Sequence, residues 1–393
     1  MHVFPKKAMI PAVNKPNYNG ENIVNLMQTL AKARGGDIGL YPALNGFDSE
    51  QLKNKRNIIL FIIDGLGYHF LNKHPDSFLH RHLHAKLSTV TPPTTAAAVT
   101  TFLTGLAPQQ HGMTGWFTYF QEIGDVVTVL PYLLRSSNEP PTLGATKLLQ
   151  LPSFFDHLTT KCYSFTPEYL KDSVVNRMLA GKADLIPYYK LEHCFAEISQ
   201  ICQLPHKKYI YAYWPGFDAL AHEHGVNSRK VAKHFNELNK HIHHLTTQLS
   251  GSNSELLICS DHGFIDSPAT CRLSLNDYPD ITSCLKHPLC GEPRLAYCYV
   301  KEDQRTIFEQ LVQTKLGHAA DLYPSLKLFK ENFFGLNEPH PQLKNRIGDY
   351  ILLMKENYSL TQQLSGEAFP NMVGYHGGLS EDELYVPLIH LKL

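Results

Sequence analysis

A short apolar run near residue 60 is the feature that most constrains the fold of this 393-residue chain. Residues Asn57 to Ile63 are continuous, rich in isoleucine and followed at once by Asp64-Gly65. Such a run is too short for a helix and apolar on both faces, which is typical of a central strand in a parallel sheet. Three similar runs follow, separated by helical patterns: 209–213, 256–260 and 350–354. We therefore predict an α/β fold whose central sheet is mostly parallel.

Changes in composition and in hydrophobic pattern divide the chain into four parts. Residues 1–54 are rich in Asn, Gly and Pro, and we expect them to form an N-terminal extension packed on the core. Residues 55–282 are the predicted core. Residues 283–349 are a predicted inserted α+β cap subdomain, with proline-marked turns around a strand over 295–300 and a helix over 303–315. Residues 350–393 are predicted to complete the core, ending in a strand over 384–393.

Charge and hydropathy exclude several classes of protein. The 36 basic and 36 acidic residues cancel, so nothing draws the chain toward a nucleic acid polymer or an anionic membrane surface. No apolar stretch approaches the roughly 20 residues of a transmembrane helix, and Met1 to Pro16 has no apolar signal core. The eight cysteines form no CxxC pair, as expected of scattered thiols. We expect a cytoplasmic protein, with export by another route left open.

Acidic residues stand directly after two of the predicted strands. Asp64 follows the first run, and Asp261-His262 follows the run over 256–260. Ligands of open α/β sheets collect beyond the carboxyl ends of the strands, so these side chains are candidates for a site. An Asp at a strand end can also cap the next helix. The histidine beside Asp261 favours a metal.

Two further segments could add ligands to that site. Asp218 and His222 are four residues apart, which places both side chains on one face of a helical turn. The same spacing occurs in ordinary surface ion pairs. His376 lies in a turn, in the string Gly374-Tyr375-His376-Gly377.

A pair of threonines begins a predicted helix. Thr94 and Thr95 follow two prolines and precede an alanine-rich stretch, so one of them lies at a helix N-terminus. The hydroxyl there either caps the helix or acts as a nucleophile, at a place where unpaired N–H groups and the helix dipole attract an anion such as phosphate.

Taken in order, these segments resemble the type I phosphodiesterase and nucleotide pyrophosphatase branch of the alkaline phosphatase superfamily. The resemblance is carried by strand-Asp64-Gly, Pro-x-Thr-Thr with Thr-Gly nine residues on, Asp-x-x-x-His, Asp-His-Gly and a late His-Gly. It covers about residues 55–270 and the last thirty or so. It implies an alkaline-phosphatase-like three-layer sandwich that hydrolyses phosphate esters of small molecules with two metal ions.

The resemblance also implies a role for each candidate. One ion would be held by Asp64, Asp261, His262 and the nucleophile, and the other by Asp218, His222 and His376. Mixed carboxylate and imidazole ligands suit zinc, with manganese less favoured. The family's reactive threonine lies nine positions before a Thr-Gly pair, which selects Thr95 over Thr94. A phospho-threonine intermediate would form and then be hydrolysed by water.

Two differences from the family bear on the substrate. Nucleotide-cleaving members commonly follow the reactive threonine with Phe-Pro-Asn-His, whereas Ala96-Ala97-Ala98-Val99 stands here. Trp116 occupies the position of an asparagine that helps to bind the phosphoryl oxygen. The aromatic side chains in this segment either stack on a base or fill the core: Trp116, Phe117, Tyr119 and Phe120.

The sequence therefore predicts the reaction better than the substrate. Phosphodiester or pyrophosphate bonds are favoured. A phosphomonoesterase with the same site is one alternative, and a non-catalytic binding or effector protein on a phosphatase scaffold is another. The oligomeric state is open.

Overall fold

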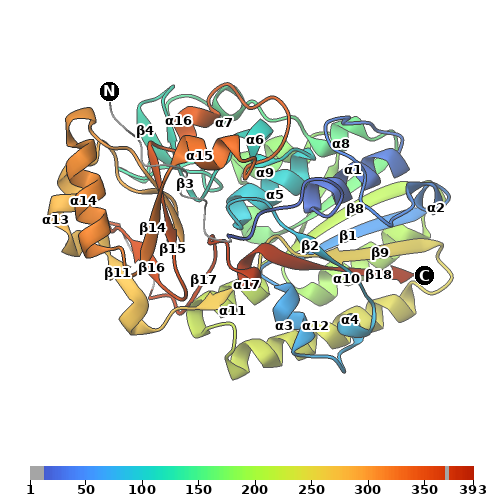
Figure 1. The fold of residues 1–393 in the computed structure, drawn as a ribbon. Coiled ribbons are helices and arrows are strands. Elements are labelled where there is room, and N and C mark those ends of the chain that lie inside the picture. The colour runs from blue at the N-terminus through green and yellow to red at the C-terminus, as the bar shows by residue number, and fades with distance from the viewer. Residues whose placement is uncertain (1–12, 368–370) are drawn as a thin grey trace.

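The computed structural model describes residues 13–367 and 371–393 and is built around a seven-stranded central sheet (Figure 1). In chain order its strands are β1 (Asn57–Ile63), β2 (Leu83–Ser88), β6 (Lys161–Pro167), β7 (Asp184–Tyr188), β8 (Lys208–Trp214), β9 (Ser254–Cys259) and β18 (Tyr385–Lys392). Their order across the sheet is β2-β18-β9-β1-β8-β6-β7. Neighbours from β9 to β7 pair in parallel, and only the C-terminal strand β18 pairs antiparallel, with β9 and β2. The mostly parallel sheet expected from sequence is confirmed.

Alternate side chains of β1 enter two separate hydrophobic layers. Ile58 and Leu60 pack into one layer, and Ile59 and Phe61 into the other. Helices that contribute to the first layer are α1 (Ile23–Ala33), α5 (Thr95–Thr104) and α8 (Phe154–His157). Helices that contribute to the second are α3 (Tyr68–Asn72), α10 (Leu191–Gln203) and α12 (Arg229–Gln248). Figure 1 shows the two groups above and below the sheet, so the molecule is a three-layer α/β sandwich.

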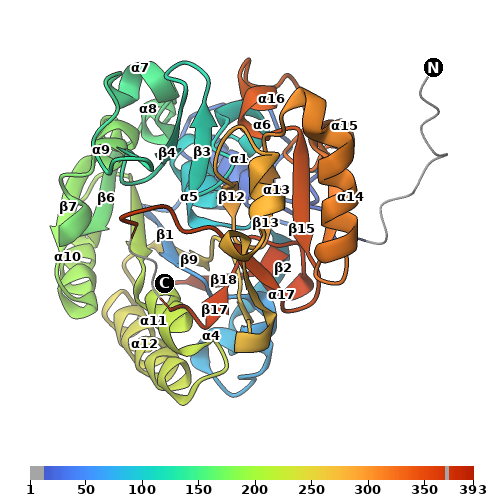
Figure 2. The ribbon, with the colours of Figure 1, turned by 90° about the vertical axis from the view of Figure 1, so that its left-hand side faces the viewer.

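A second seven-stranded sheet lies beside the first. In chain order its strands are β3 (Phe117–Phe120), β4 (Asp125–Thr128), β5 (Leu133–Leu134), β12 (Cys290–Glu292), β13 (Leu295–Cys298), β14 (Ala320–Pro324) and β15 (Tyr350–Met354). The pairs in this sheet are antiparallel. The carboxyl ends of β1, β8 and β9 face it (Figure 1), and Figure 2 shows helix α14 (Arg305–Lys315) beside β15.

The second sheet bears on two predictions from the sequence. The strand and helix expected between 295 and 315 are present as β13 and α14. The assignment of 350–354 to the central parallel sheet is wrong, because β15 pairs antiparallel with β13 and β14. All five residues of β15 are buried, with Leu352 in one hydrophobic cluster and Ile351 in another. A strand covered on both faces has the same apolar pattern in either sheet, so the pattern does not distinguish them.

The segment before residue 55 contributes a buried helix. Asn22 begins α1 with a capping box, because its side chain accepts from the N–H of Val24 and its own N–H donates to Asn25. The Gln28 amide donates to the carbonyl of Gly105, 2.9 Å away, which ties α1 to the end of α5. The four-part division of the chain stays a prediction.

The longest helix, α12, has 20 residues. None of the helices within 13–367 and 371–393 combines the length and the apolar character needed to cross a membrane.

Candidate active site

The ends of two adjacent strands bring three predicted residues together. Asp64 follows β1, and Asp261 and His262 follow its neighbour β9. The Nε2 atom of His262 lies 3.3 Å from Oδ1 of Asp64 and 3.6 Å from Oδ2 of Asp261. All three side chains are buried. This first group could hold one metal ion.

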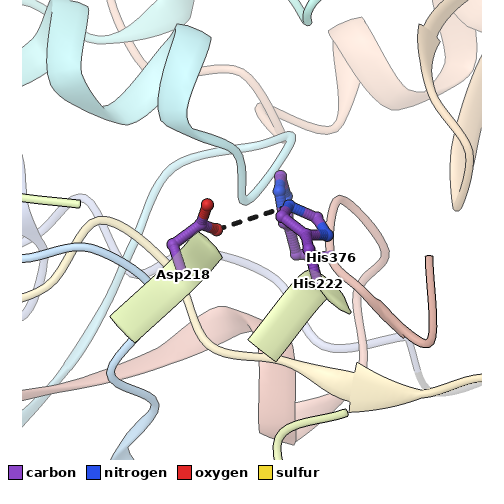
Figure 3. A group of neighbouring side chains, drawn as sticks. All are labelled: Asp218, His222 and His376. Atoms are coloured by element: carbon purple, nitrogen blue, oxygen red, sulfur yellow. Dashed lines mark ion pairs between the residues drawn. The ribbon is translucent and has the colours of Figure 1, made fainter. Parts of the chain in front are cut away.

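A second group faces the first. Asp218 and His222 lie one turn apart on helix α11 (Gly216–His224), with 3.4 Å between Asp218 Oδ1 and His222 Nε2. His376 follows strand β17 (Gly374–Tyr375), which pairs with β10 (Ile265–Asp266). Figure 3 shows the Asp218 carboxylate turned toward the two imidazoles. These three side chains could hold a second ion.

Two contacts join the groups into one site. The His262 and His376 rings stack with centroids 3.7 Å apart, and His262 Nε2 lies 3.9 Å from Asp218 Oδ1. The six side chains that the sequence singled out therefore lie together, although Asp64 and His376 are far apart along the chain.

Thr95 lies beside the first group. It is the first residue of α5, and its Oγ1 is 3.2 Å from His262 Nε2. Thr94, the alternative, is the N-cap residue, and its hydroxyl donates instead to Oε1 of Glu292 at 2.6 Å. Of the two threonines, Thr95 is the one whose hydroxyl oxygen contacts a member of the two candidate ligand groups.

Backbone carbonyls set the orientation of the imidazoles. Nδ1 of His222 lies 2.9 Å from the Gly374 carbonyl, Nδ1 of His376 lies 3.2 Å from that of Pro93, and Nδ1 of His262 lies 3.1 Å from that of Gly263. A proton on each Nδ1 satisfies these contacts and leaves the Nε2 lone pair free. This is how ligating histidines are commonly held.

The glycine after His262 is required by close packing. A Cβ at Gly263 would lie 1.9 Å from the carbonyl oxygen of Asp382. The Gly263 N–H donates to the carbonyl of Glu383, 2.9 Å away. The C-terminal helix α17 (Glu381–Leu384) is thus pressed against the loop that carries His262.

The site contains several buried acidic side chains and too few cationic side chains to neutralise them. Burial raises the pKa of Asp64, raises that of Asp218 to about 7 and raises that of Asp261 to about 8. Burial also lowers the pKa of His222 to about 4 and lowers that of His376. A divalent cation binds imidazoles that are neutral and carboxylates that are deprotonated, so the lowered pKa values of the histidines favour metal binding.

Three carboxylate oxygens in the site accept no hydrogen bond from the described residues: Asp64 Oδ1, Asp218 Oδ1 and Asp261 Oδ2. Buried oxygens of this kind are costly unless something compensates them. The companion oxygens of Asp64 and Asp261 have partners, since Tyr213 donates to Asp64 Oδ2 and the Gly65 N–H donates to Asp261 Oδ1 at 3.0 Å. The oxygens without hydrogen bonds, two in the first group and one in the second, are therefore available to bind metal cations.

Sequence reasoning missed two residues of the site. Tyr213 is the last residue but one of strand β8, and nothing in that apolar run of the sequence indicates that its hydroxyl bonds to Asp64. Glu292 ends β12 in the region predicted as an insertion, and its Oε1 accepts from Thr94 and from the N–H of Trp116, each at 2.6 Å. Burial raises the pKa of Glu292 to about 7.

Two cavities reach Thr95. The larger, about 430 Å³, is lined by the second metal-binding group and by Trp116, Phe117, Glu292 and Tyr375; we call it the Glu292 cavity. The smaller, about 70 Å³, runs from Thr95 between apolar side chains that include Val99, Leu103, Phe165 and Leu179. The nucleophile candidate therefore has space on two sides.

Comparisons with known proteins agree with this geometry. The family model "Type I phosphodiesterase / nucleotide pyrophosphatase" matches residues 58–379. Murine ectonucleotide pyrophosphatase/phosphodiesterase 5 superposes with a TM-score of 0.64 at 15% identity, covering 84% of this chain and 87% of that one. An inactive variant of the murine protein was solved in complex with AMP. No curated protein sequence shows a significant match.

A bacterial structure has the same fold. Phosphonoacetate hydrolase from Sinorhizobium meliloti superposes with a TM-score of 0.60 at 17% identity, covering 86% of this chain and 90% of that one. Together these likenesses confirm the alkaline-phosphatase-like α/β fold. Because the family model covers most of the chain, the protein belongs to the type I phosphodiesterase/nucleotide pyrophosphatase family and is a phosphoester hydrolase.

Proposed function

We propose that this protein is a metal-dependent phosphodiesterase in which Thr95 attacks phosphorus at a site for two divalent cations, favouring zinc. The observation that carries the proposal is the 3.2 Å contact between Thr95 Oγ1 and His262 Nε2, at the meeting point of two three-residue ligand groups. Asp64, Asp261 and His262 would hold one cation, and Asp218, His222 and His376 the other. With one open position each, such ligand sets suit catalytic zinc.

The reaction would proceed in two displacements at phosphorus. Two bound cations would lower the pKa of the Thr95 hydroxyl and stabilise charge on the leaving oxygen. The Thr95 oxygen forms a bond to phosphorus as the bond to the first ester oxygen breaks, and the proton lost from Thr95 balances the one gained by the released alcohol. Water then attacks the phospho-threonine, which restores the Thr95 hydroxyl and releases the phosphate product.

The chain's own residues would orient this chemistry. Thr95 is fixed at the first turn of α5, where backbone N–H groups without helical partners attract the phosphate oxygens. The carbonyls of Gly374, Pro93 and Gly263 hold the three imidazoles in place. Asp64 and Asp261 are themselves buried, so their carboxylates are shielded from bulk water.

The two cavities at Thr95 favour a diester over a monoester. A phosphodiester carries two substituents on phosphorus, and each cavity offers space for one. A phosphomonoesterase needs only one such space, and remains the alternative.

The experiment is a comparison of rates on bis(4-nitrophenyl) phosphate and 4-nitrophenyl phosphate by the zinc-loaded protein. We expect a higher kcat/KM for the diester and loss of turnover on both after chelation. A higher kcat/KM for the monoester would select the phosphomonoesterase, and turnover that survives chelation would exclude the proposed chemistry.

A further inference from the structure

A tyrosine hydroxyl contacts the candidate metal ligand Asp64. The hydroxyl of Tyr213 donates to Oδ2 of the Asp64 carboxylate. The other oxygen, Oδ1, accepts no hydrogen bond from the described residues and lies 3.3 Å from Nε2 of His262, within the first ligand group. The hydroxyl and a cation in that group would therefore use different oxygens of one carboxylate.

The register of two neighbouring strands places this hydroxyl. β8 pairs in parallel with β1, and Tyr213 lies opposite Ile62, two residues before Asp64. The Asp64 N–H donates to the Trp214 carbonyl at 3.0 Å, and the hydroxyl of Tyr188 donates to the Tyr213 carbonyl. The main chain at both strand ends is thus held in place, and the Tyr213 side chain bridges the gap between them.

Tyr213 is the last of three tyrosines on one face of β8. Tyr209, Tyr211 and Tyr213 alternate along the strand, so their rings point into the same hydrophobic layer. The hydroxyls of Tyr209 and Tyr211 are buried and have no hydrogen-bond partner in the part of the chain that the structure describes. All three rings contribute to packing, and the bond to Asp64 distinguishes Tyr213 from the other two.

Asp64 depends on such a partner because it is buried. Its side chain is 2% exposed, which leaves bulk water little access to replace the tyrosine. Carboxylates that bind metal ions are commonly held by hydrogen bonds from outside the ligand set, which fix their orientation. Without the hydroxyl, the Asp64 carboxylate would lose a donor at Oδ2 and would be free to turn away from the first group.

The hydroxyl acts on one ligand group and not on the other. Among the hydrogen bonds of the described residues, the Tyr213 side chain bonds to Asp64 and to no member of the second group. Asp218, the carboxylate of the second group, is 17% exposed and is therefore more open to water. The second group thus provides an internal reference for any change at Tyr213.

We infer that Tyr213 is a positioning residue that sets the affinity of the first ligand group for its cation. Its hydroxyl holds Oδ2 of Asp64, so that Oδ1 stays turned toward Asp261 and His262. The inference rests on the two-cation site of the proposed function, and it adds a residue from outside both ligand groups that controls how tightly one of the two cations is bound.

Tyr213→Phe tests this role, since it removes the hydroxyl and keeps the ring. We expect zinc to bind the first group about 10- to 100-fold more weakly and the second group as in the wild type. Competition with a chromophoric chelator gives the two dissociation constants. Anomalous diffraction from crystals at limiting zinc assigns each constant to its group. Wild-type constants for both groups, or a loss confined to the second group, would overturn the inference.

Tyr209→Phe is the matched control. It removes the same atom from the same face of the same strand, and that hydroxyl has no partner among the residues described. Both zinc dissociation constants should stay at their wild-type values in this variant. An equal loss of zinc affinity in Tyr209→Phe and Tyr213→Phe would reflect the packing of β8 and would overturn the inference.

The zinc dependence of turnover separates positioning from a contact with substrate, because Tyr213 also lines the smaller cavity. If the hydroxyl acts through the cation, kcat/KM of Tyr213→Phe on bis(4-nitrophenyl) phosphate should rise toward the wild-type value as zinc is added. A kcat/KM that stays low at saturating zinc, with unchanged zinc affinity, would make Tyr213 a substrate contact and would contradict the proposed role.

A failure here is separable from a failure of the proposed function. If the wild-type protein binds two zinc ions and hydrolyses the diester while Tyr213→Phe keeps normal zinc affinity, only the role of Tyr213 is wrong. If the wild-type protein binds no zinc at the two ligand groups, the proposed function is wrong as well.

Discussion

The hydroxyl oxygen of Thr95 lies 3.2 Å from Nε2 of His262, although the two residues are 167 positions apart. The contact forms because α5 begins where β9 ends, so a helix N-terminus and a strand end point at the same space. A threonine hydroxyl is a weak nucleophile at neutral pH and needs an activating group nearby. The two ligand groups beside Thr95 could hold metal ions that act as the activating group.

Replacement of Thr95 should abolish turnover without unfolding the protein. We expect Thr95→Ala to lower kcat by about a thousandfold or more while metal content and melting temperature stay close to those of the wild type. Thr95→Ser keeps a hydroxyl and should retain part of the activity. Thr100→Ala is the matched control on the same helix, since that hydroxyl only bonds to the carbonyl of Ala96. If Thr94→Ala loses activity and Thr95→Ala does not, the other threonine is the nucleophile.

The metal-free protein should lose stability as the pH rises from 6.5 to 8. Burial raises the folded-state pKa of Asp218 to about 7 and that of Asp261 to about 8, well above their unfolded values. These protonated acids make their full contribution to the free energy of unfolding below the pKa of the unfolded state. That contribution is lost as the pH rises through the pKa of the folded state. The lowered pKa of His222 acts in the opposite direction, but only below 6.5.

Chemical denaturation across that range measures the effect. We expect the free energy of unfolding of the metal-free protein to fall by about 1 to 2 kcal/mol. Asp261→Asn should reduce the fall, and bound zinc should remove it. A free energy of unfolding that rises with pH in the metal-free protein would contradict the raised pKa values of Asp218 and Asp261.

Activity should decline in acid for a separate reason. Metal ligands must be deprotonated to bind zinc, so protons compete with zinc at Asp218 and Asp261, whose pKa values burial raises to about 7 and about 8, and at more acidic pH also at the histidine ligands. We expect kcat/KM on bis(4-nitrophenyl) phosphate to fall below about pH 6 and to recover partly when more zinc is added. A profile that is flat from pH 5 to 9 would be incompatible with imidazole ligands.

A buried ion pair should support the loop that carries His376. Glu383 accepts from Arg294 Nε at 2.7 Å and from the N–H of Gly378 at 2.7 Å, and both charged side chains are buried. Glu383→Gln would leave the guanidinium uncompensated, and we expect a loss of about 3 kcal/mol in unfolding free energy together with weaker zinc binding.

The exposed pair Lys233–Glu237 gives the comparison for that variant. Its atoms are 3.9 Å apart and both side chains are solvent-exposed, so Glu237→Gln should cost less than about 0.5 kcal/mol. Equal effects of the two substitutions in urea denaturation would show that Glu383 does not stabilise the loop.

Much of the site could be predicted because its residues stand at positions with a clear local pattern. Asp64, Asp261 and His262 follow apolar strands, and strand ends of a parallel sheet meet at one edge. Asp218 and His222 share a helix face through their spacing. The order of the motifs along the chain then linked these segments to one family, which the family model over residues 58–379 confirms.

The remaining parts depend on contacts that no local pattern carries. Glu292 reaches the site because the antiparallel sheet packs against the start of α5, and its neighbours in sequence give no sign of this. The strand over 350–354 was placed in the wrong sheet because it is buried on both faces. The domain boundaries, the ligand roles and the cytoplasmic localisation stay predictions.

The most direct test of the account is anomalous diffraction at the zinc edge from crystals of the zinc-loaded protein. We predict two zinc ions per chain, one bound by Asp64, Asp261 and His262 and the other by Asp218, His222 and His376, with the Thr95 oxygen facing them. Zinc bound at other residues, or no zinc among these six side chains, would contradict the account.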